Sequence, residues 1–454
     1  MNHSSRQMQR YAKYKPSGVE WIGAIPEHWD SKRLKYVALV QPSNVDKKTI
    51  EGELPVFLCN YMDVYENESV DSSITFMEAT ATEAEIAKFK IKMGDVLVTK
   101  DSETPGDIAN PAFVKDNFEN ANVICAYHLT QIRPNRNELI GEYLFRLFQE
   151  TKYKGQFEVA ANGVTRFGLS VSAFSDAFVP LPRPEEQTAI ANYLDEKTAQ
   201  IDTLIAKKQK LIEFLKEERT AIINQAVTKG INPEVKLKPS GIDWLGAIPE
   251  HWDVKKLKYV VSKVGSGITP TGGASVYQNE GIPLLRSQNI YNDGLKLDDV
   301  AYISEDIDEQ MSNSRIEEDD VLLNITGASI GRCFYVPKGF GKGNVNQHVC
   351  IIRPIQDLLR TKFLHSIIIS GYGQTLKDVY QTGANREGLN FQQIRSFDLP
   401  IPDIQEQRQI VAFIEAHTSR IDATISKIEK EIELLKENRT ALISEVVTGK
   451  IKVA

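Results

Sequence analysis

Several short motifs in the chain come close to catalytic or cofactor-binding sites, but none is complete. Asn110-Pro-Ala-Phe113 lacks the second proline of the Asn-Pro-Pro-Tyr/Phe motif of adenine methyltransferases, and no glycine-rich cofactor loop precedes it. Gly265-Ser-Gly267 and the segment 339–343 fit neither GxxxxGK[ST] nor GxGxxG, so we interpret both as loops. Glu234-Val-Lys236 lacks the upstream acid of a nuclease site. We therefore predict no catalytic residue in this chain.

The cysteines and histidines do not have the spacing of metal ligands. The four cysteines are Cys59, Cys125, Cys333 and Cys350. None forms a C-x-x-C pair and none lies near a histidine at ligand spacing, so we expect reduced core cysteines and no metal site. His128 and His348 occupy matching positions beside expected strands, and we interpret them as structural.

Composition indicates a globular protein of several domains. The chain has 454 residues, 41% of them hydrophobic and 25% charged. This length suggests roughly two to four domains. No apolar stretch is long enough to cross a membrane and the first 15 residues lack a signal-peptide core, so we expect a cytoplasmic protein without a membrane partner. The formal net charge of −7 does not favour tight nucleic-acid binding by the isolated chain, although it says less about a larger complex.

The chain contains two copies of one unit. KPSGVEWIGAIPEHWDSKRLKYV at 15–37 matches KPSGIDWLGAIPEHWDVKKLKYV at 238–260 in about 18 of 23 positions. We call this segment the tryptophan motif, because it holds all four tryptophans of the chain. They form either a docking surface or, as we favour, an anchor that fastens the motif to its domain. Between the repeated segments only short motifs agree, namely GDVLVT with DDVLLN, and two IRP and two GL sequences.

The second repeated segment predicts a pair of long helices. The copies begin at Glu185 and Gln405, follow a proline and acids, and end beside Gly230 and Gly449. Each would be about 40 residues, or roughly 60 Å, long. Apolar residues recur at intervals of three and four, which is typical of a coiled-coil seam. The expected seam residues are Leu194, Ile201, Leu204, Ile205, Leu211, Ile212, Leu215 and Ile222, then Ile414, Ile421, Ile425, Ile428, Ile432, Leu435, Leu442 and Val446.

Two matching arginines lie beside this seam. Arg219 and Arg439 both fall within a KExRTA sequence. They are either arginines at a solvated helix edge, or polar groups that set the register or contact a partner subunit. We name both as candidate partner-binding residues.

These patterns predict an α+β fold. We expect two domains of mixed β-sheet with short helices at 141–150 and 357–379, joined by two long helices that pair as an antiparallel coiled coil with internal pseudo-two-fold symmetry. The expected boundaries are 1–180 and 231–398 for the domains, and 181–230 and 399–454 for the helices.

The repeat layout resembles the specificity subunits of type I restriction–modification systems, over nearly the whole chain. The duplicated PSGxxWxGxIPxHW motif, two unlike domains and two matching helices carry the resemblance. It implies that each domain recognises half of a bipartite, asymmetric site in double-stranded DNA, and that the helices set the spacing and bind two methyltransferase subunits. Motor-nuclease subunits would join for cleavage. The resemblance assigns S-adenosylmethionine, ATP and Mg²⁺ to these partners, and no cofactor to this chain.

Base edges are read by arginine, lysine, amide and hydroxyl side chains on loops, and several such clusters occur. The candidates in the first domain are Asn60, Tyr61, Lys100, Ser102 and Arg166. Those in the second domain are Thr269, Arg286, Gln288, Asn289, Thr326, Ser329, Arg332, Asn346, Gln347 and Arg386. Ordinary polar loops would give the same pattern at any single position.

Two alternatives remain open. A self-contained methyltransferase or nuclease would need a cofactor loop or an acidic metal cluster, and the sequence has neither. A coiled-coil scaffold would explain the helices, but not why two domains on the same frame differ in sequence.

Overall fold

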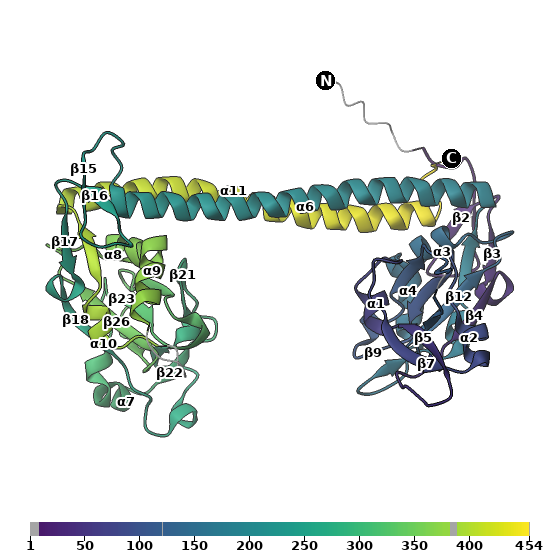
Figure 1. Cartoon of the computed structure of the whole chain (residues 1–454), viewed down its shortest axis with the longest axis horizontal. Coiled ribbons are helices and arrows are strands. Elements are labelled where there is room, and N and C mark those ends of the chain that lie inside the picture. Colours follow the sequence, from purple (N-terminus) through teal and green to yellow (C-terminus); the bar gives the residue numbers. More distant parts are fainter. Residues whose placement is uncertain (1–8, 120, 382–387, 454) are drawn as a thin grey trace. The chain divides into compact units, whose positions relative to one another are not determined.

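A computed structural model describes residues 9–119, 121–381 and 388–453, and Figure 1 shows the chain. The residues form two compact units. Unit 1 contains residues up to Lys208 together with Lys430 onward, and unit 2 contains Gln209–Glu429. Both mix small β-sheets with short helices, which confirms the expected α+β class. Each unit also contains one end of each long helix, so neither is a continuous stretch of chain.

The main sheets of the two units share the order of four strands, and the sheet of unit 1 has a fifth strand at one edge. In unit 1 the sheet runs β4-β12-β8-β10-β6, with β4 at Ala38–Pro42, β12 at Leu129–Pro134, β8 at Val96–Thr99, β10 at Pro111–Val114 and β6 at Ser69–Val70. In unit 2 it runs β18-β26-β23-β24, with β18 at Val261–Ser266, β26 at Val349–Pro354, β23 at Val321–Asn324 and β24 at Cys333–Tyr335. Both copies of the repeated unit therefore form the same core of the main sheet, although their sequences differ.

A second sheet of three strands is also shared. It runs β11-β5-β7 in unit 1, with β11 at Val123–Cys125, β5 at Leu54–Cys59 and β7 at Met77–Ala81. Unit 2 has β22-β19-β25, with β22 at Ala301–Ile303, β19 at Ile282–Leu285 and β25 at Asn344–Val345. All four cysteines are buried and free, as expected.

The short helices differ from the expected ones. Instead of one helix over 357–379, the chain forms α8 (Thr361–Ile369) and α9 (Gly371–Tyr380). Ser370 divides them, because its side chain accepts a hydrogen bond from the Gly373 N–H and so caps a new helix. In unit 1, α3 (Gly141–Phe148) is likewise followed by α4 (Thr151–Ala160), which was not expected. Glu150 caps α4 in the same way.

Buried ion pairs explain why GDV/DDV and IRP survive in both copies. Asp95 pairs with Arg133 at 2.7 Å in unit 1, and Asp320 pairs with Arg353 at 2.7 Å in unit 2. Both aspartates are buried. Each short motif therefore contributes one partner of a pair that joins adjacent strands of the main sheet.

The long helices are α6 (Pro184–Lys229) and α11 (Ile404–Val447). Early residues of α6 contact late residues of α11 in unit 1, and the reverse holds in unit 2, so the expected antiparallel pairing is confirmed within each unit. Most expected seam residues are buried or half-buried. Leu204 and Leu211 are exceptions, with 42% and 45% of their surface exposed. They flank the seam because they lie one helical position outside its three–four spacing.

Each tryptophan motif joins both helix ends to its domain. The motif begins with paired strands, β1 (Tyr14–Pro16) with β2 (Ala24–Pro26) in unit 1, and β15 (Leu237–Pro239) with β16 (Ala247–Pro249) in unit 2. The next strand, β3 (Asp30–Arg33) or β17 (Asp253–Lys256), pairs with the strand that leads into a long helix, β14 (Phe178–Leu181) or β27 (Asp398–Ile401).

In unit 1, Trp29 is fully buried, and His28 lies 3.0 Å from Glu186 at the start of α6. Gly449, which follows α11, adopts a φ of +72°, and a Cβ there would collide with Pro26. Unit 2 repeats the arrangement with Trp252, the His251–Glu406 pair at 2.7 Å, and Gly230 after α6. This supports the anchoring interpretation for Trp29 and Trp252, while Trp244 stays exposed.

The buried ion pair of unit 2 makes a stability prediction. Asp320→Ala should lower the free energy of unfolding by about 3 kcal/mol, because it leaves Arg353 without its buried carboxylate. Glu317 also pairs with Arg353 but is exposed, so Glu317→Ala is the control and should cost less than about 1 kcal/mol. Urea unfolding monitored by circular dichroism measures both, and equal losses would refute the explanation.

A buried histidine predicts a pH dependence of stability. Burial lowers the pKa of His365, in α8, to about 4, against about 6.5 in an unfolded chain. As pH falls from 6.5 towards 4 the unfolded state binds a proton that the folded state does not, so stability decreases. Between pH 7 and pH 5 this loss should be about 2 kcal/mol.

The measurement is denaturant unfolding of wild type and His365→Gln at both pH values. The variant should lose correspondingly less stability on acidification than wild type. If both lose the same amount, His365 is not the group responsible.

Candidate DNA interface

The loops that carry most of the predicted residues meet at one end of the main sheet. In unit 1, the Lys100 N–H donates to the carbonyl of His128, and the Leu169 N–H donates to the carbonyl of Lys100. In unit 2, the Ile325 N–H donates to the carbonyl of His348, and the Leu389 N–H donates to the carbonyl of Ile325. The two units therefore share one backbone frame of three chain segments at this end of the sheet. We call the surface built on it the loop surface.

In unit 1 the loop surface carries a charged cluster around a histidine. Nδ1 of His128 lies 2.7 Å from Asp101, and Nη2 of Arg166 lies 2.9 Å from the same carboxylate. Tyr61 and Ser102 line a hollow of about 410 Å³ beside Asp101 and Arg166. The Tyr61 ring stacks on Tyr65, with centroids 5.4 Å apart. Tyr61, Ser102 and Arg166 are thus brought together as a polar and aromatic surface.

The other two candidates in unit 1 are engaged locally. Asn60 directly precedes the short helix α1 (Tyr61–Tyr65), and its backbone N–H donates to Asp63 at 2.7 Å. The Lys100 ammonium donates to the Ser43 carbonyl at 3.0 Å. In this arrangement both residues shape the loops that present Tyr61 and Ser102, and their contact with DNA stays a prediction.

In unit 2 the same place is neutral and hydroxyl-rich. Thr326 lies 2.7 Å from Nδ1 of His348, Gln347 lies 3.0 Å from its Nε2, and Thr269 donates to Gln347 at 2.5 Å. Thr326 and Gln347 therefore contact His348 directly, and Thr269 is linked to it through Gln347. Asn346 is buried and accepts the His348 N–H, so it holds the loop in shape. Arg386 lies outside the described residues.

The remaining candidates of unit 2 form a neighbouring group around β20 (Ile290–Tyr291) and β21 (Gly294–Leu295). Arg286, Gln288 and Asn289 all donate to Asp299, and Asn289 is fully enclosed. Arg332 lies over the Tyr291 ring at 5.0 Å and follows Ser329. Asn324 joins this group to β23 by donating to the Ser287 carbonyl at 2.8 Å.

Sequence analysis missed the central role of the histidines. His128 and His348 were interpreted as structural, yet each holds loop-surface residues together through its ring nitrogens. Their matching positions, each four residues before an IRP motif, were the available signal. The partner in the ring contact changes from Asp101 to Thr326, so the same histidine supports different surface chemistry in the two units.

The candidate partner-binding arginines lie in cross-helix ion pairs. Arg219 pairs with Asp422 at 2.9 Å, and Arg439 pairs with Asp202 at 3.0 Å. These pairs support the interpretation that they set the helix register. Both side chains stay partly exposed, and their contact with a partner subunit stays a prediction.

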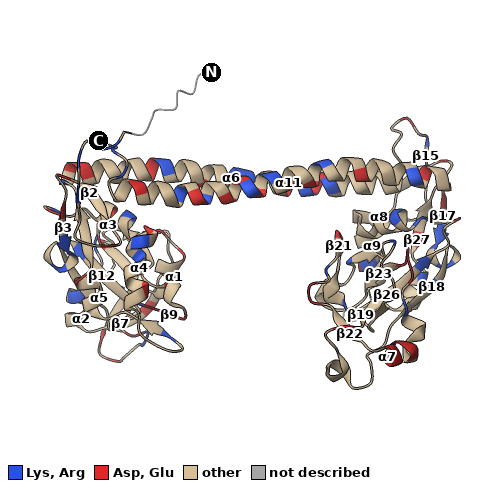
Figure 2. Ribbon diagram, turned by 180° about the vertical axis from the view of Figure 1, so that it is seen from behind, with Lys and Arg blue, Asp and Glu red and all other residues tan. Residues whose placement is uncertain are grey.

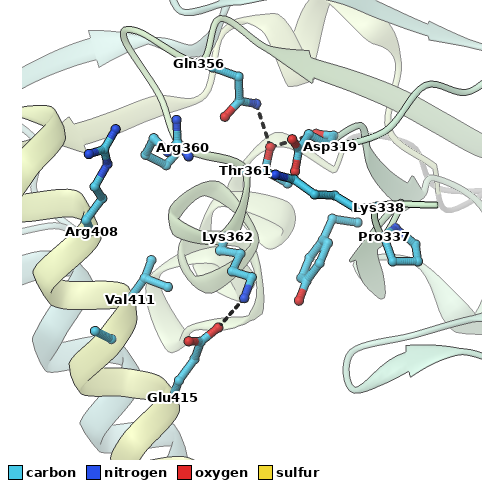
Figure 3. A pocket seen from close by; sticks show the side chains of 12 residues that line it. Asp319, Pro337, Lys338, Gln356, Arg360, Thr361, Lys362, Arg408, Val411 and Glu415 are labelled. Atoms are coloured by element: carbon cyan, nitrogen blue, oxygen red, sulfur yellow. Dashed lines mark hydrogen bonds and ion pairs between the residues drawn. The ribbon is translucent and has the colours of Figure 1, made fainter. Parts of the chain in front are cut away.

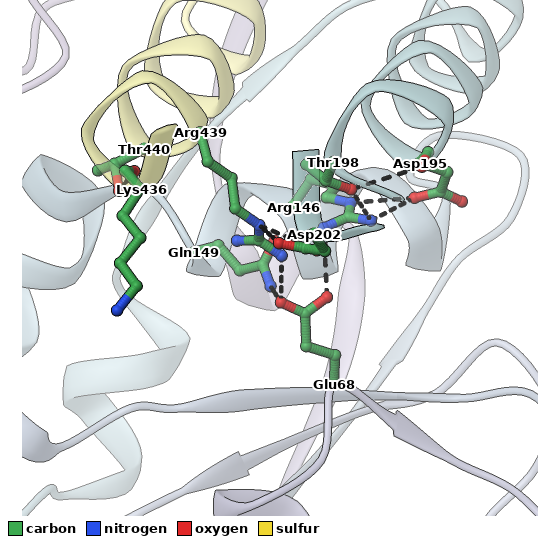
Figure 4. Close-up of polar contacts among 9 residues, drawn as sticks. All are labelled: Glu68, Arg146, Gln149, Asp195, Thr198, Asp202, Lys436, Arg439 and Thr440. Carbon is green, nitrogen blue, oxygen red and sulfur yellow. Dashed lines mark hydrogen bonds and ion pairs between the residues drawn. The ribbon is translucent and has the colours of Figure 1, made fainter. Parts of the chain in front are cut away.

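In unit 1 the arginine pair extends into the domain (Figure 4). Glu68 accepts from Arg439 at 2.5 Å and lies 3.6 Å from Arg146, which itself pairs with Asp195 on α6 at 2.7 Å. Arg146 is almost fully buried. One domain carboxylate therefore bridges two arginines that are each bound to α6, which fixes the domain against the helix pair.

Unit 2 has a basic hollow where the domain meets α11 (Figure 3). It encloses about 550 Å³ and is lined by Lys338, Arg360, Lys362 and Arg408 among others. Lys362 is paired with Glu415 at 2.7 Å. Unit 1 has Ile140, Glu142 and Thr188 in place of Arg360, Lys362 and Arg408, so these three basic residues are not repeated in unit 1. Asp319 lines it just before β23, whereas Thr326 follows that strand at the loop surface.

Charge is distributed unevenly over the rest of the surface (Figure 2). Both signs alternate along α6 and α11, whereas α7 (Glu305–Gln310) carries four acids. Among the described residues, no group of three or more histidine, cysteine, aspartate or glutamate side chains could hold a metal ion. No helix in the described part of the chain has the length and apolar character to span a membrane.

Comparison with known families decides the identity of this architecture. The model of the type I restriction modification DNA specificity domain matches twice, over residues 26–213 and 249–434. The chain belongs to this family. The two matches coincide with the two copies found by internal comparison, and each begins within a tryptophan motif and ends in a long helix.

Relatives of similar length support the assignment to the specificity-subunit family. The chain is 24% identical over 450 residues to a putative type I restriction enzyme MjaX specificity subunit of Methanocaldococcus jannaschii, covering 95% of this chain and 96% of the relative. It is 26% identical over 306 residues to the EcoBI specificity subunit of Escherichia coli, covering 66% and 64%. This protein is thus a DNA sequence-specificity subunit of the type I restriction–modification class.

Solved structures agree on the fold. A chain from a study of complex assembly and conformational transition in a type I restriction–modification system superposes with a TM-score of 0.72 at 16% identity, covering 93% of this chain and 98% of that one. The crystal structure of the HsdS subunit from Thermoanaerobacter tengcongensis gives a TM-score of 0.52 at 17% identity, covering 94% and 98%.

Proposed function

We propose that each unit of this specificity subunit reads one half of a bipartite, asymmetric site in double-stranded DNA through its loop surface. The observation that carries the proposal is the repeated backbone frame with unlike side chains on it. Asp101 and Arg166 occupy the frame in unit 1, and Thr326, Gln347 and Thr269 occupy it in unit 2. Different donors and acceptors in one frame select different base edges, so the two half-sites differ.

The side chains on the two loop surfaces have the chemistry of base readers. Arginine donates to guanine O6 and N7, amides pair with adenine, and carboxylates accept from the cytosine amino group. Burial raises the pKa of Tyr61, so its hydroxyl stays protonated and can both donate and accept. The hydrogen bonds among these side chains restrict their rotamers before DNA binds, which reduces the entropy cost of recognition.

In this proposal the chain is not itself an enzyme. The helices set the spacing between half-sites and dock two methyltransferase subunits, with Arg219 and Arg439 among the contacts, and motor-nuclease subunits join the complex for cleavage. S-adenosylmethionine, ATP and Mg²⁺ belong to those partners. Support comes from the family, whose matching model describes a DNA specificity domain.

Exchange of one domain tests whether each unit reads its own half-site. Replacing residues 38–180 by the corresponding segment of another family member should change one half-site and leave the other half-site and the spacer unchanged. The tryptophan motif and both helices remain native in this chimera, so the frame is preserved. The measurement is methylation mapping by long-read sequencing in a host that expresses the chimera with its methyltransferase. A change in both half-sites, or in neither, would contradict modular reading.

A single amide gives a finer test. Gln347→Ala removes a side chain that Thr269 and His348 position on the loop surface of unit 2. A well-placed amide contact contributes about 1–3 kcal/mol of base discrimination, so preference at one base pair of one half-site should fall about tenfold. The readout is binding of the assembled methyltransferase complex to a panel of singly substituted DNA duplexes.

The matched control is Gln310→Ala, which removes an exposed glutamine at the end of α7. It should leave every base preference unchanged. If Gln347→Ala weakened binding to all sequences equally, its role would be loop stability and not base reading.

A further inference from the structure

The helix pair contains one polar contact that the internal repeat does not duplicate. Lys208 of α6 lies on the seam, in step with Ile205 and Ile212, and its ammonium reaches Glu431 of α11 at 2.6 Å. The position of α11 that matches Lys208 is Ile428, and the position of α6 that matches Glu431 is Leu211. The two helices are therefore near copies of each other whose charges differ at this level.

The other cross-helix ion pairs do not distinguish the helices. Arg219–Asp422 and Arg439–Asp202 are the same pair in both copies of the repeat. Because α6 carries both Asp202 and Arg219, and α11 carries both Asp422 and Arg439, two copies of either helix could form them as well. These pairs set an antiparallel register without selecting the partner.

The Lys208–Glu431 contact, in contrast, favours pairing of α6 with α11 over pairing of like helices. If α6 paired with α6 of a second chain in the same register, Lys208 would meet Leu211 and find no carboxylate. If α11 paired with α11, Glu431 would meet Ile428. Only α6 with α11 places the ammonium against the carboxylate and Ile428 against the leucine.

Lys208 has no alternative partner on its own helix. The residues three and four positions away are Leu204, Ile205, Leu211 and Ile212, and none can accept a hydrogen bond through its side chain. Its side chain is only 22% exposed. A half-buried ammonium without a carboxylate is unfavourable, whereas a seam lysine with a flanking glutamate is a known way to specify coiled-coil partners.

We propose that Lys208 and Glu431 make the coiled coil selective for α6 with α11, against pairing of either helix with its own copy in a second chain. The partner that each long helix selects is the other long helix of the same chain. Under the proposed function, this selectivity ensures that two different reading domains, and not two identical ones, address one DNA site. Only that last consequence rests on the proposed function, since partner choice is measured without DNA.

The decisive variant makes the two helices alike at this level. In the double variant Lys208→Ile and Glu431→Leu, every pairing of the helices places isoleucine against leucine. We expect thermal stability equal to or above wild type, because apolar residues replace a half-buried ion pair. We also expect a loss of selectivity when the full chain is refolded from denaturant at increasing concentration.

The readout is cross-linking of refolded mixtures of ¹⁴N- and ¹⁵N-labelled full chain. Amine cross-links that join α6 of one isotope to α6 of the other report pairing of like helices, and mass spectrometry counts them. Relative to wild type, their share should rise about tenfold in the double variant, the ratio expected when one ion-pair preference is lost. A share equal to that of wild type would overturn the proposal.

Charge exchange separates selectivity from stability. Glu431→Lys alone should lower the Tm by about 4 °C and raise the share of like-helix cross-links, because two ammonium groups then face each other. Adding Lys208→Glu should return both values to those of wild type. Absence of this rescue would also overturn the proposal.

Asp422→Asn is the matched control. It weakens a cross-helix pair that like helices could form equally well. It should lower the Tm without raising the share of like-helix cross-links. If it raised that share as much as the double variant, any weakening of the coil would explain the effect, and the selective role of Lys208 and Glu431 would be refuted.

Discussion

The junction at each tryptophan motif is the constraint on which the rest of the structure depends. A fully buried tryptophan lies between the first turn of one long helix and the glycine that ends the other, and the preceding histidine pairs with a glutamate of that first turn. Since one motif binds the start of α6 with the end of α11, and the other binds the start of α11 with the end of α6, parallel pairing of the helices is excluded. Both glycines adopt a positive φ, which disfavours other residues, and at Gly449 a Cβ would also collide with Pro26.

From this junction the two units build the same sheet and then diverge. The Asp95–Arg133 and Asp320–Arg353 pairs hold equivalent strands in equivalent places, so loops at the end of those strands inherit one backbone frame. The frame tolerates an Asp–His–Arg cluster in one unit and a Thr–His–Gln cluster in the other. A specificity subunit needs this separation, because recognition can change on the loops while the packing that supports them stays the same.

The helix pair combines contacts that stabilise with a contact that discriminates. The symmetric arginine–aspartate pairs and the buried isoleucines favour an antiparallel coil of any two such helices. Lys208 and Glu431 add selectivity at some cost in burial, as polar groups in coiled coils do elsewhere. In unit 1 Arg439 also reaches Glu68, so the same coil position that sets the register holds the domain.

The amino-acid sequence by itself determined the duplication, the α+β class, the two long helices with their glycine ends, and the free buried cysteines, because repeats, hydrophobic period and capping are local properties. It could not show that Ser370 divides an expected single helix, because this depends on packing against the rest of the unit, whereas the three–four spacing already places Leu204 and Leu211 beside the seam. Tertiary structure alone decided which separated residues meet. Asp95 and Arg133, His128 and Asp101, and Lys208 and Glu431 lie 27 to 223 positions apart, and only the strand pairing and the antiparallel coil bring them into contact.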